Sequence, residues 1–272
     1  MAEINAVFEE KWSTEVKREY NRTGSLLRKH IRVQTGVVGD TYNFPVFNKN
    51  TISNYQKARG AVLDWQLGNH DKVTATLTDA LHPLVLDKLD LVKTAANYRE
   101  QYVRNAGEDL GRQTDARILT ALDAAAQVAP TTTGGLTFEK LLEAIEILNK
   151  NDVPMTDRTL VFGPEQLSDL LKETELTSGD YQIKMALANG QMVSAMGLNW
   201  VQHTGLTYTG SPASANTCYL VHKDAVGLAI AQDITTTIRE LPERNSWGIL
   251  STMVMGSALI DPRGVVKITC NF

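Results

Sequence analysis

The chain has 272 residues, of which 43% are hydrophobic and 21% are charged, so it can bury a large core and lacks the composition of a disordered protein. Its formal net charge of −4 gives no overall attraction to nucleic acid or to anionic membranes. No apolar run approaches the ~20 residues of a membrane span, and the acidic N-terminus lacks the order of a secretory signal, so we expect the chain to stay in the cytosol where it is made.

The first predicted element is an N-terminal helix. Its large apolar residues recur at every fourth position and therefore share one face; they are Ile4, Phe8, Trp12, Val16 and Tyr20. The end of this helix and the segment after it are cationic, with Lys17, Arg18, Arg22, Arg28, Lys29 and Arg32 against Glu19 alone. This segment is either a solvated face or a surface that binds the carboxylates or phosphates of a partner.

Two strands joined by a long connection follow. Apolar and polar residues alternate around Phe44 and again around Ala75, which is typical of half-buried strands. An isolated two-stranded ribbon is marginally stable in water. We therefore expect this hairpin arm to lie against something beyond its own domain, although an enzyme could use it as a lid.

Residues 89–128 are predicted to form a single helix of about 40 residues, much longer than a typical globular helix. The apolar residues recur three or four apart, which places them on one face: Val103, Ala106, Leu110, Ile118, Leu122 and Ala125. Gly107 and Gly111 each cost roughly 1 kcal/mol relative to alanine inside a helix. Packing rather than intrinsic propensity must therefore hold the middle of this spine together.

The second half of the chain begins after a turn-rich break at 130–135. Thr137 is the predicted cap of a helix whose inner face carries Leu141, Leu142, Ile145 and Leu148. A buried strand at 158–162, a helix that starts at Pro164, a short helix at 181–188 and a strand at 198–201 come next. The remaining segments read as strands at 219–222, 226–231, 234–241, 247–259 and 265–270, with a turn at 242–246 that closes an antiparallel ribbon.

Sequence motifs for catalysis are missing. There is no GxSxG, HExxH, Walker or GxGxxG sequence, and the five histidines show no ligand spacing. Asp87 and Asp90 could share a proton, but the surrounding leucines favour a helix start, where carboxylates are stabilised by the dipole. Cys218 and Cys270 are expected to be buried free thiols. We therefore expect a building block rather than an enzyme, with no cofactor and no metal.

The order of the elements resembles the major capsid protein of tailed bacteriophages, the fold named after phage Hong Kong 97. The segments that carry the resemblance are GDTYNFP (39–45), DLGRQTDARIL (109–119), RTLVFGPEQL (158–167), HKDAVGLA (222–229), GSALIDP (256–262) and VVKI (265–268). Each segment is degenerate alone, and together they span nearly the whole chain.

The resemblance implies an α+β fold in four parts. Residues 1–33 would be an N-terminal arm and 40–79 an extended loop that lies across a neighbouring subunit. Residues 34–39, 80–153 and 223–261 would form a peripheral domain with the spine helix, and 154–222 with 262–272 an axial domain. We expect the spine and ribbon core to fold without the N-terminal arm.

The function implied is self-assembly through pentamers and hexamers into an icosahedral shell that encloses double-stranded DNA without sequence-specific binding and without a membrane. Heterologous contacts that close give such rings. From position and residue type, the candidate intersubunit contacts are Phe8, Trp12, Arg28, Tyr55, Arg59 and Trp65. The chain would lie in the virion capsid, and in the host cytoplasm during assembly.

Further partners implied by the family are a scaffolding protein, a portal and a possible decoration protein. Some members of the family carry a long scaffolding segment before the arm, whereas here the arm starts at once. We expect either that such a segment is cleaved away or that a separate scaffolding protein is used, and Met1 favours the second. Nothing in the sequence singles out a lysine for crosslinking to a neighbour. Two alternatives remain open: an encapsulin-type compartment with the same architecture that encloses cargo enzymes, and a soluble cytosolic enzyme whose site assembles from scattered residues.

Overall fold

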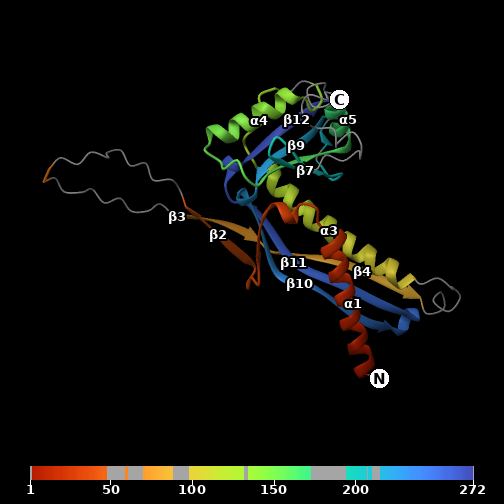
Figure 1. Ribbon diagram of the computed structural model, residues 1–272. Helices are drawn as coiled ribbons and strands as arrows, with labels where there is room; N and C mark the ends of the chain where they lie inside the picture. The colour runs from red at the N-terminus through yellow and green to blue at the C-terminus, as the bar shows by residue number, and fades with distance from the viewer. Residues whose placement is uncertain are drawn as a thin grey trace.

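A computed structural model describes residues 2–47, 59–60, 70–87, 98–131, 134–172, 194–206, 208–209 and 215–271. One long helix, α3 (Tyr98–Asp123), connects two sheets that lie toward its opposite ends (Figure 1). None of the helices in the described part of the chain is long and apolar enough to cross a membrane.

The first sheet has four strands in the order β1 (Arg32–Thr35), β10 (Val226–Leu241), β11 (Ser246–Leu259) and β4 (Thr78–Asp87). The predicted antiparallel ribbon is confirmed as β10 and β11, but the two strands expected at 226–231 and 234–241 form one strand with register shifts between Ile230 and Thr235. Strand β4 was not predicted. Asp87 ends this strand, so the expectation of a helix start there is wrong.

The second sheet is ordered β12 (Val265–Asn271), β9 (Ala215–His222), β5 (Arg158–Phe162), β7 (Leu198–Gln202) and β6 (Ser194–Ala195), with β8 (Tyr208–Thr209) paired to β9. Every residue of β5 is buried, as its apolar run predicts. Helix α5 (Pro164–Lys172) follows directly, with its proline at the first position as predicted. The helix expected at 181–188 lies outside the described residues.

Helix α4 (Phe138–Lys150) packs on β12. The Thr137 side chain accepts a hydrogen bond from Lys140 N, which confirms the predicted cap. Leu141 and Leu148 are buried as expected, but Leu142 is 45% exposed and does not belong to the inner face. The expected domain boundary at residue 153 would therefore assign α4 and β12 to different domains, although the two pack together.

The spine helix is confirmed from Tyr98 onward, and residues 88–97 lie outside the described part of the chain. All six residues of the predicted stripe are buried. The helix ends at Asp123, however, five residues earlier than predicted. Beyond it the backbone hydrogen-bonds to β12, with Ala129 N donating to Lys267 O and Lys267 N donating to Gln127 O. This pairing outcompetes continuation of the helix.

Helix α1 (Ala2–Thr23) packs closely against α3. Glycines make this approach possible: a Cβ added at Gly107 would lie 3.0 Å from Tyr20 N, and one at Gly111 would lie 2.3 Å from Gly24 C. The two glycines that weaken the spine as an isolated helix therefore create the contact that stabilises it. This finding confirms that packing holds the middle of the helix.

The predicted hairpin is confirmed as the antiparallel pair β2 (Thr41–Phe47) and β3 (His70–Thr76). Its base lies on a small second core made of Val37, Phe44, Ala75, Ala229, Ala258 and Ile260. From this base the two strands lead away from the body of the subunit (Figure 1). The hairpin is therefore fixed at one end to the ends of β10 and β11.

Candidate functional site

The two faces of the hairpin arm differ in polarity. One face is apolar, and its Tyr42 and Phe44 rings make an edge-to-face contact with centroids 4.8 Å apart. The opposite face is polar and exposed, and there Thr74 Oγ1 donates to Asn43 Oδ1 at 2.6 Å. Since the apolar face is held against the subunit's own core, the arm leaves its body in a fixed direction and presents polar groups to its surroundings.

Of the predicted contact residues on the arm, only Arg59 is described. It lies in a turn with Gly60, and its side chain is exposed. Tyr55 and Trp65 lie outside the described residues. The arm's contact surface therefore stays a prediction, carried by one exposed arginine and by the direction of the strands.

Two of the predicted contact residues of the N-terminal segment, Trp12 and Arg28, make contacts within their own subunit. Trp12 is 4% exposed and belongs to the main core. The Arg28 guanidinium lies 5.3 Å from the centroid of the Tyr20 ring. Phe8 is within α1, but its side chain is outside the described part of the chain. Of the six predicted residues, three have described side chains: Trp12 lies in the core, Arg28 lies against Tyr20 and Arg59 lies in the arm. A shared contact surface stays a prediction.

The N-terminal segment is built into the fold more deeply than expected. Its side chains in the main core are Trp12, Val16, Tyr20, Leu27 and Ile31. Strand β1 then pairs in parallel with β10, with Arg32 opposite Gly227. This burial and pairing argue against the expectation that the spine and ribbon core folds without this segment.

Part of the cationic segment is engaged internally. Lys17 forms an ion pair with Asp233 of β10. Burial alone would raise the pKa of Asp233, but hydrogen bonds from Lys17 and from Ile234 N–H outweigh it, so this pKa is lowered. The pKa of His30 is also lowered, first by burial and then by the charges of Lys29 and Lys223.

An apolar strip on the open face of the four-stranded sheet was missed by sequence reasoning. Leu81 and Val85 of β4 are each 49% exposed, and Leu250 of β11, opposite Pro83, is 38% exposed. Alternate residues of β4 face α3, where His82 Nδ1 lies 2.9 Å from Asp109 Oδ2. Because both faces of β4 carry apolar residues, the alternation that identifies a strand is weak. Exposed apolar patches of this kind are typical of interaction surfaces.

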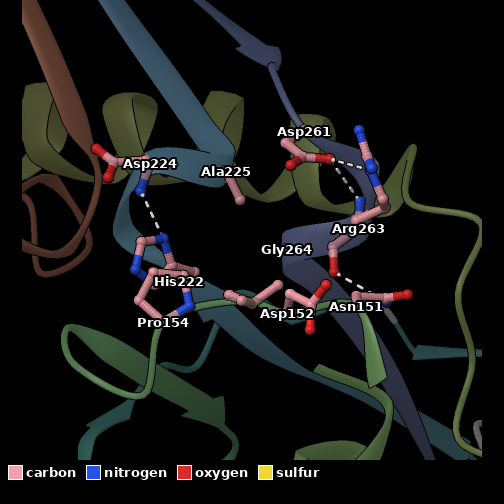
Figure 2. A pocket seen from close by; sticks show the side chains of 10 residues that line it. Asn151, Asp152, Pro154, His222, Asp224, Ala225, Asp261, Arg263 and Gly264 are labelled. Carbon is pink, nitrogen blue, oxygen red and sulfur yellow. Dashed lines mark hydrogen bonds and ion pairs between the residues drawn. The ribbon is translucent and has the colours of Figure 1, made fainter. Parts of the chain in front are cut away.

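A pocket of about 250 Å³ lies where the two sheets meet (Figure 2). Its polar groups are used mainly to hold the chain turns around it. Asp261 Oδ1 accepts from Arg263 N at 3.0 Å, Asn151 Nδ2 donates to Arg263 O, and Asp224 N donates to His222 Nδ1. The pocket is smaller than typical ligand pockets, and these side chains are bonded to backbone groups of the surrounding turns.

The titratable groups in the described ranges do not form a metal site. No group of three or more His, Cys, Asp or Glu in these ranges is placed to hold a metal ion. Cys218 and Cys270 are buried free thiols, as predicted, with sulfurs 4.0 Å apart. The hydrogen bond between the thiols and the burial of Cys218 raise the pKa of Cys218, which keeps that thiol protonated and unreactive.

Comparison with known proteins agrees with this architecture. The sequence profile of a family described as phage capsid protein matches residues 4–271. No curated protein matches the chain.

Solved structures show a similar fold at low identity. A structure from Mycobacterium phage Che8 is 22% identical over 85% of each chain, with a TM-score of 0.69. The capsid of cyanophage P-SCSP1u is 16% identical, covers 90% of this chain and 88% of its own, and gives a TM-score of 0.72. A virus-like particle from Pyrococcus furiosus is 13% identical, covers 96% and 99% respectively, and gives 0.64.

The fold is therefore the Hong Kong 97-type capsid fold predicted from the order of elements. The profile match covers nearly the whole chain, including the hairpin arm, the spine and both sheets. The chain belongs to the phage capsid protein family.

Proposed function

We propose that this chain is the major capsid protein of a tailed phage and that it assembles through pentamers and hexamers into an icosahedral shell around double-stranded DNA. The observation that carries the proposal is the hairpin arm, whose base is fixed on its own core and whose strands lead away from the body. The family match and the capsid neighbours support the same role. The role is structural rather than catalytic.

An arm fixed at one end suits a heterologous contact, in which one subunit's arm meets a different surface of the next. Such contacts close into rings when the rotation between subunits allows it. We propose that the distal arm, with Tyr55, Arg59 and Trp65, makes this contact. The exposed strip of Leu81, Val85 and Leu250 is a further surface available to a neighbour.

The direct test removes the distal arm and keeps its base. Phe47 lies opposite His70 in the register of the hairpin, so residues 48–69 can be replaced by Asn-Gly, which favours a two-residue hairpin turn. The shortened chain should retain the circular dichroism and urea midpoint of the intact chain but form no closed particles by light scattering and negative-stain microscopy. Closed shells of normal size from the shortened chain would overturn the role of the arm.

A matched control keeps the length of the arm and changes its chemistry. Replacing Arg59 alone by alanine should weaken assembly less than removal of the distal arm, because an interface depends on several anchors. If the intact chain remains a monomer or small dimer at every concentration, also in a lysate of its natural source, the capsid proposal itself fails. That outcome would favour a soluble protein.

The contents of the particle distinguish two shells of the same architecture. The likeness to the virus-like particle from Pyrococcus furiosus supports a second candidate, a compartment that encloses cargo protein. Nucleic-acid absorbance in purified particles would support the phage shell, and a bound cargo protein would support the compartment. For the phage shell we also propose assembly in the host cytoplasm and a scaffolding protein, a portal and a decoration protein as partners.

A further inference from the structure

A buried carboxylate in the middle of the spine receives hydrogen bonds from two other parts of the chain. Asp115 is 2% exposed. Its Oδ1 accepts from Ser25 Oγ at 2.5 Å and from Leu27 N at 3.2 Å, and its Oδ2 accepts from Leu26 N at 3.1 Å and from His203 Nε2 at 3.3 Å. All four donors that meet this carboxylate are remote from it in the sequence.

These donors belong to different elements. Residues 25–27 form the exit of α1, the turn that leads through a short 3₁₀ helix (Arg28–His30) into β1. His203 directly follows β7 of the six-stranded sheet, and its own N–H donates to Phe162 O of β5 at 2.9 Å. A single side chain on α3 thus joins the N-terminal segment to the six-stranded sheet.

The hydrogen bonds of His203 indicate which ring nitrogen carries the proton. Gly205 N donates to His203 Nδ1 at 2.9 Å, so Nδ1 is an acceptor and the ring proton is on Nε2, which donates to Asp115. His203 is 8% exposed. The ring therefore bridges the backbone of its own turn and the carboxylate on the spine, and it can make both bonds only while the 203–205 turn stays against α3.

We propose that Asp115 is a joint that couples the position of the six-stranded sheet to the exit of α1. When the 203–205 turn moves away from α3, the buried carboxylate loses one of four donors. The carboxylate must then turn toward a new partner or admit water, because an undercompensated buried charge is unfavourable. Either response weakens its bonds to the amides of Leu26 and Leu27, and the N-terminal segment loosens.

The coupling operates in both directions, since energetic coupling between two sites is reciprocal. Displacement of α1 removes Ser25 and the amides that follow it from the carboxylate, and the 203–205 turn is then held less firmly. Asp115 lies one turn beyond Gly111, where Gly24, the residue after α1, closely approaches α3. Asp115 is therefore placed to transmit a movement of α1 or of the six-stranded sheet along the spine helix. This inference concerns the single subunit and does not depend on assembly.

The test measures amide hydrogen exchange in the full chain with two variants of His203. His203→Asn keeps an acceptor for Gly205 N, because asparagine bonds the backbone two residues on, but it is too short to reach Asp115. His203→Gln keeps a donor at the distance of Nε2. The amides of Leu26 and Leu27 should exchange about tenfold faster in the asparagine variant, and the glutamine variant should restore much of the protection.

His222→Asn is the matched control. His222 is also 8% exposed, also belongs to the six-stranded sheet, and its Nδ1 also accepts from the backbone two residues on, Asp224 N. His222 is not one of the four donors to the Asp115 carboxylate. Faster exchange at Leu26 and Leu27 in this variant as well would mean general destabilisation and would overturn the proposal.

A second variant tests the reverse direction and remains usable if the His203 variants fold poorly. Ser25→Ala removes one half-buried hydroxyl that donates to Asp115. The amide of Gly205, in the turn that follows β7, should then exchange several-fold faster, while the exchange of the Asp224 amide should be unchanged. Unchanged exchange at Gly205 in a folded Ser25→Ala chain would show that the two bonds to Asp115 are independent, which contradicts the coupling.

Discussion

Replacing Gly111 by alanine tests the contact between α1 and α3. A Cβ at this position would lie 2.3 Å from Gly24 C and 2.5 Å from Gly24 Cα, whereas carbon atoms pack at about 3.5–4.0 Å. The atoms that it meets belong to the backbone, so no change of rotamer can relieve the clash. The end of α1 must move by about 1 Å or more, in a region where the interior is closely packed.

Two opposing contributions determine the sign of the effect. Alanine in place of glycine inside a helix stabilises it by roughly 1 kcal/mol, and overpacking of a core costs about 1–3 kcal/mol. Because the clash at Gly111 is with backbone, we expect the upper part of that range and a net loss of about 2 kcal/mol in the free energy of unfolding. At Gly107 the nearest atom is Tyr20 N at 3.0 Å, so Gly107→Ala should be closer to neutral.

Urea unfolding of unassembled subunits measures this loss. Tryptophan fluorescence and circular dichroism should give coincident transitions before a free energy is assigned, and the midpoint should fall with little change in slope. Ala116→Gly is the control, since residue 116 is exposed on the same helix and should lose about 1 kcal/mol through propensity alone. A Gly111→Ala chain that is more stable than the parent would refute the close helix contact.

Three further predictions concern single side chains. Trp12→Ala should lower the stability of the unassembled subunit by about 3–5 kcal/mol because the indole is in the main core; a pure intersubunit anchor would leave it unchanged. The pKa of Asp233 is lowered from 3.8, so its pairing with Lys17 stabilises the subunit above about pH 4, and this stabilisation is lost as the pH falls through the lowered pKa. For this partly exposed pair the loss of stability should be below about 1 kcal/mol. Urea midpoints measured from about pH 5 to about pH 2.5 should show this pH dependence in the parent chain, and Asp233→Asn should abolish it. Cys218 and Cys270 are both buried, so a thiol reagent should label them only at the rate of unfolding, and fast labelling of the native chain would contradict their burial.

The elements predicted correctly are those whose local pattern agrees with their tertiary environment. The stripe on α3, the buried strand β5 with its apolar run Leu160–Phe162 and the Thr137 cap each follow from local chemistry. Strand β4 was missed because it is apolar on both faces: one faces α3, and the other carries the exposed Leu81 and Val85. Periodicity identifies an element only when its two faces differ in polarity.

The end of the spine shows how a distant partner decides a boundary. Alanine-rich sequence continues past Asp123 with good helix propensity, so local signals favour a longer helix. The chain nevertheless leaves the helix because residues 127–129 pair with Lys267 of β12, which follows almost 140 residues later. A backbone pairing of this range has no signal in the local sequence.

The N-terminal segment shows the same limit for the candidate site. Aromatic residues at every fourth position predict a buried stripe, but the pattern is identical whether the stripe packs on its own subunit or on a neighbour. The features that decide between them are three glycines and one aspartate. Gly24 directly follows α1 and meets Gly111 of α3, and Gly107 of α3 lies close to Tyr20 of α1. Asp115 accepts hydrogen bonds from the exit of α1. None of these residues carries a distinctive signal by itself in the sequence, and only their juxtaposition shows that the segment from Trp12 to Ile31 packs into the subunit's core. In the described chain, the hairpin arm is therefore the element best placed to reach another subunit.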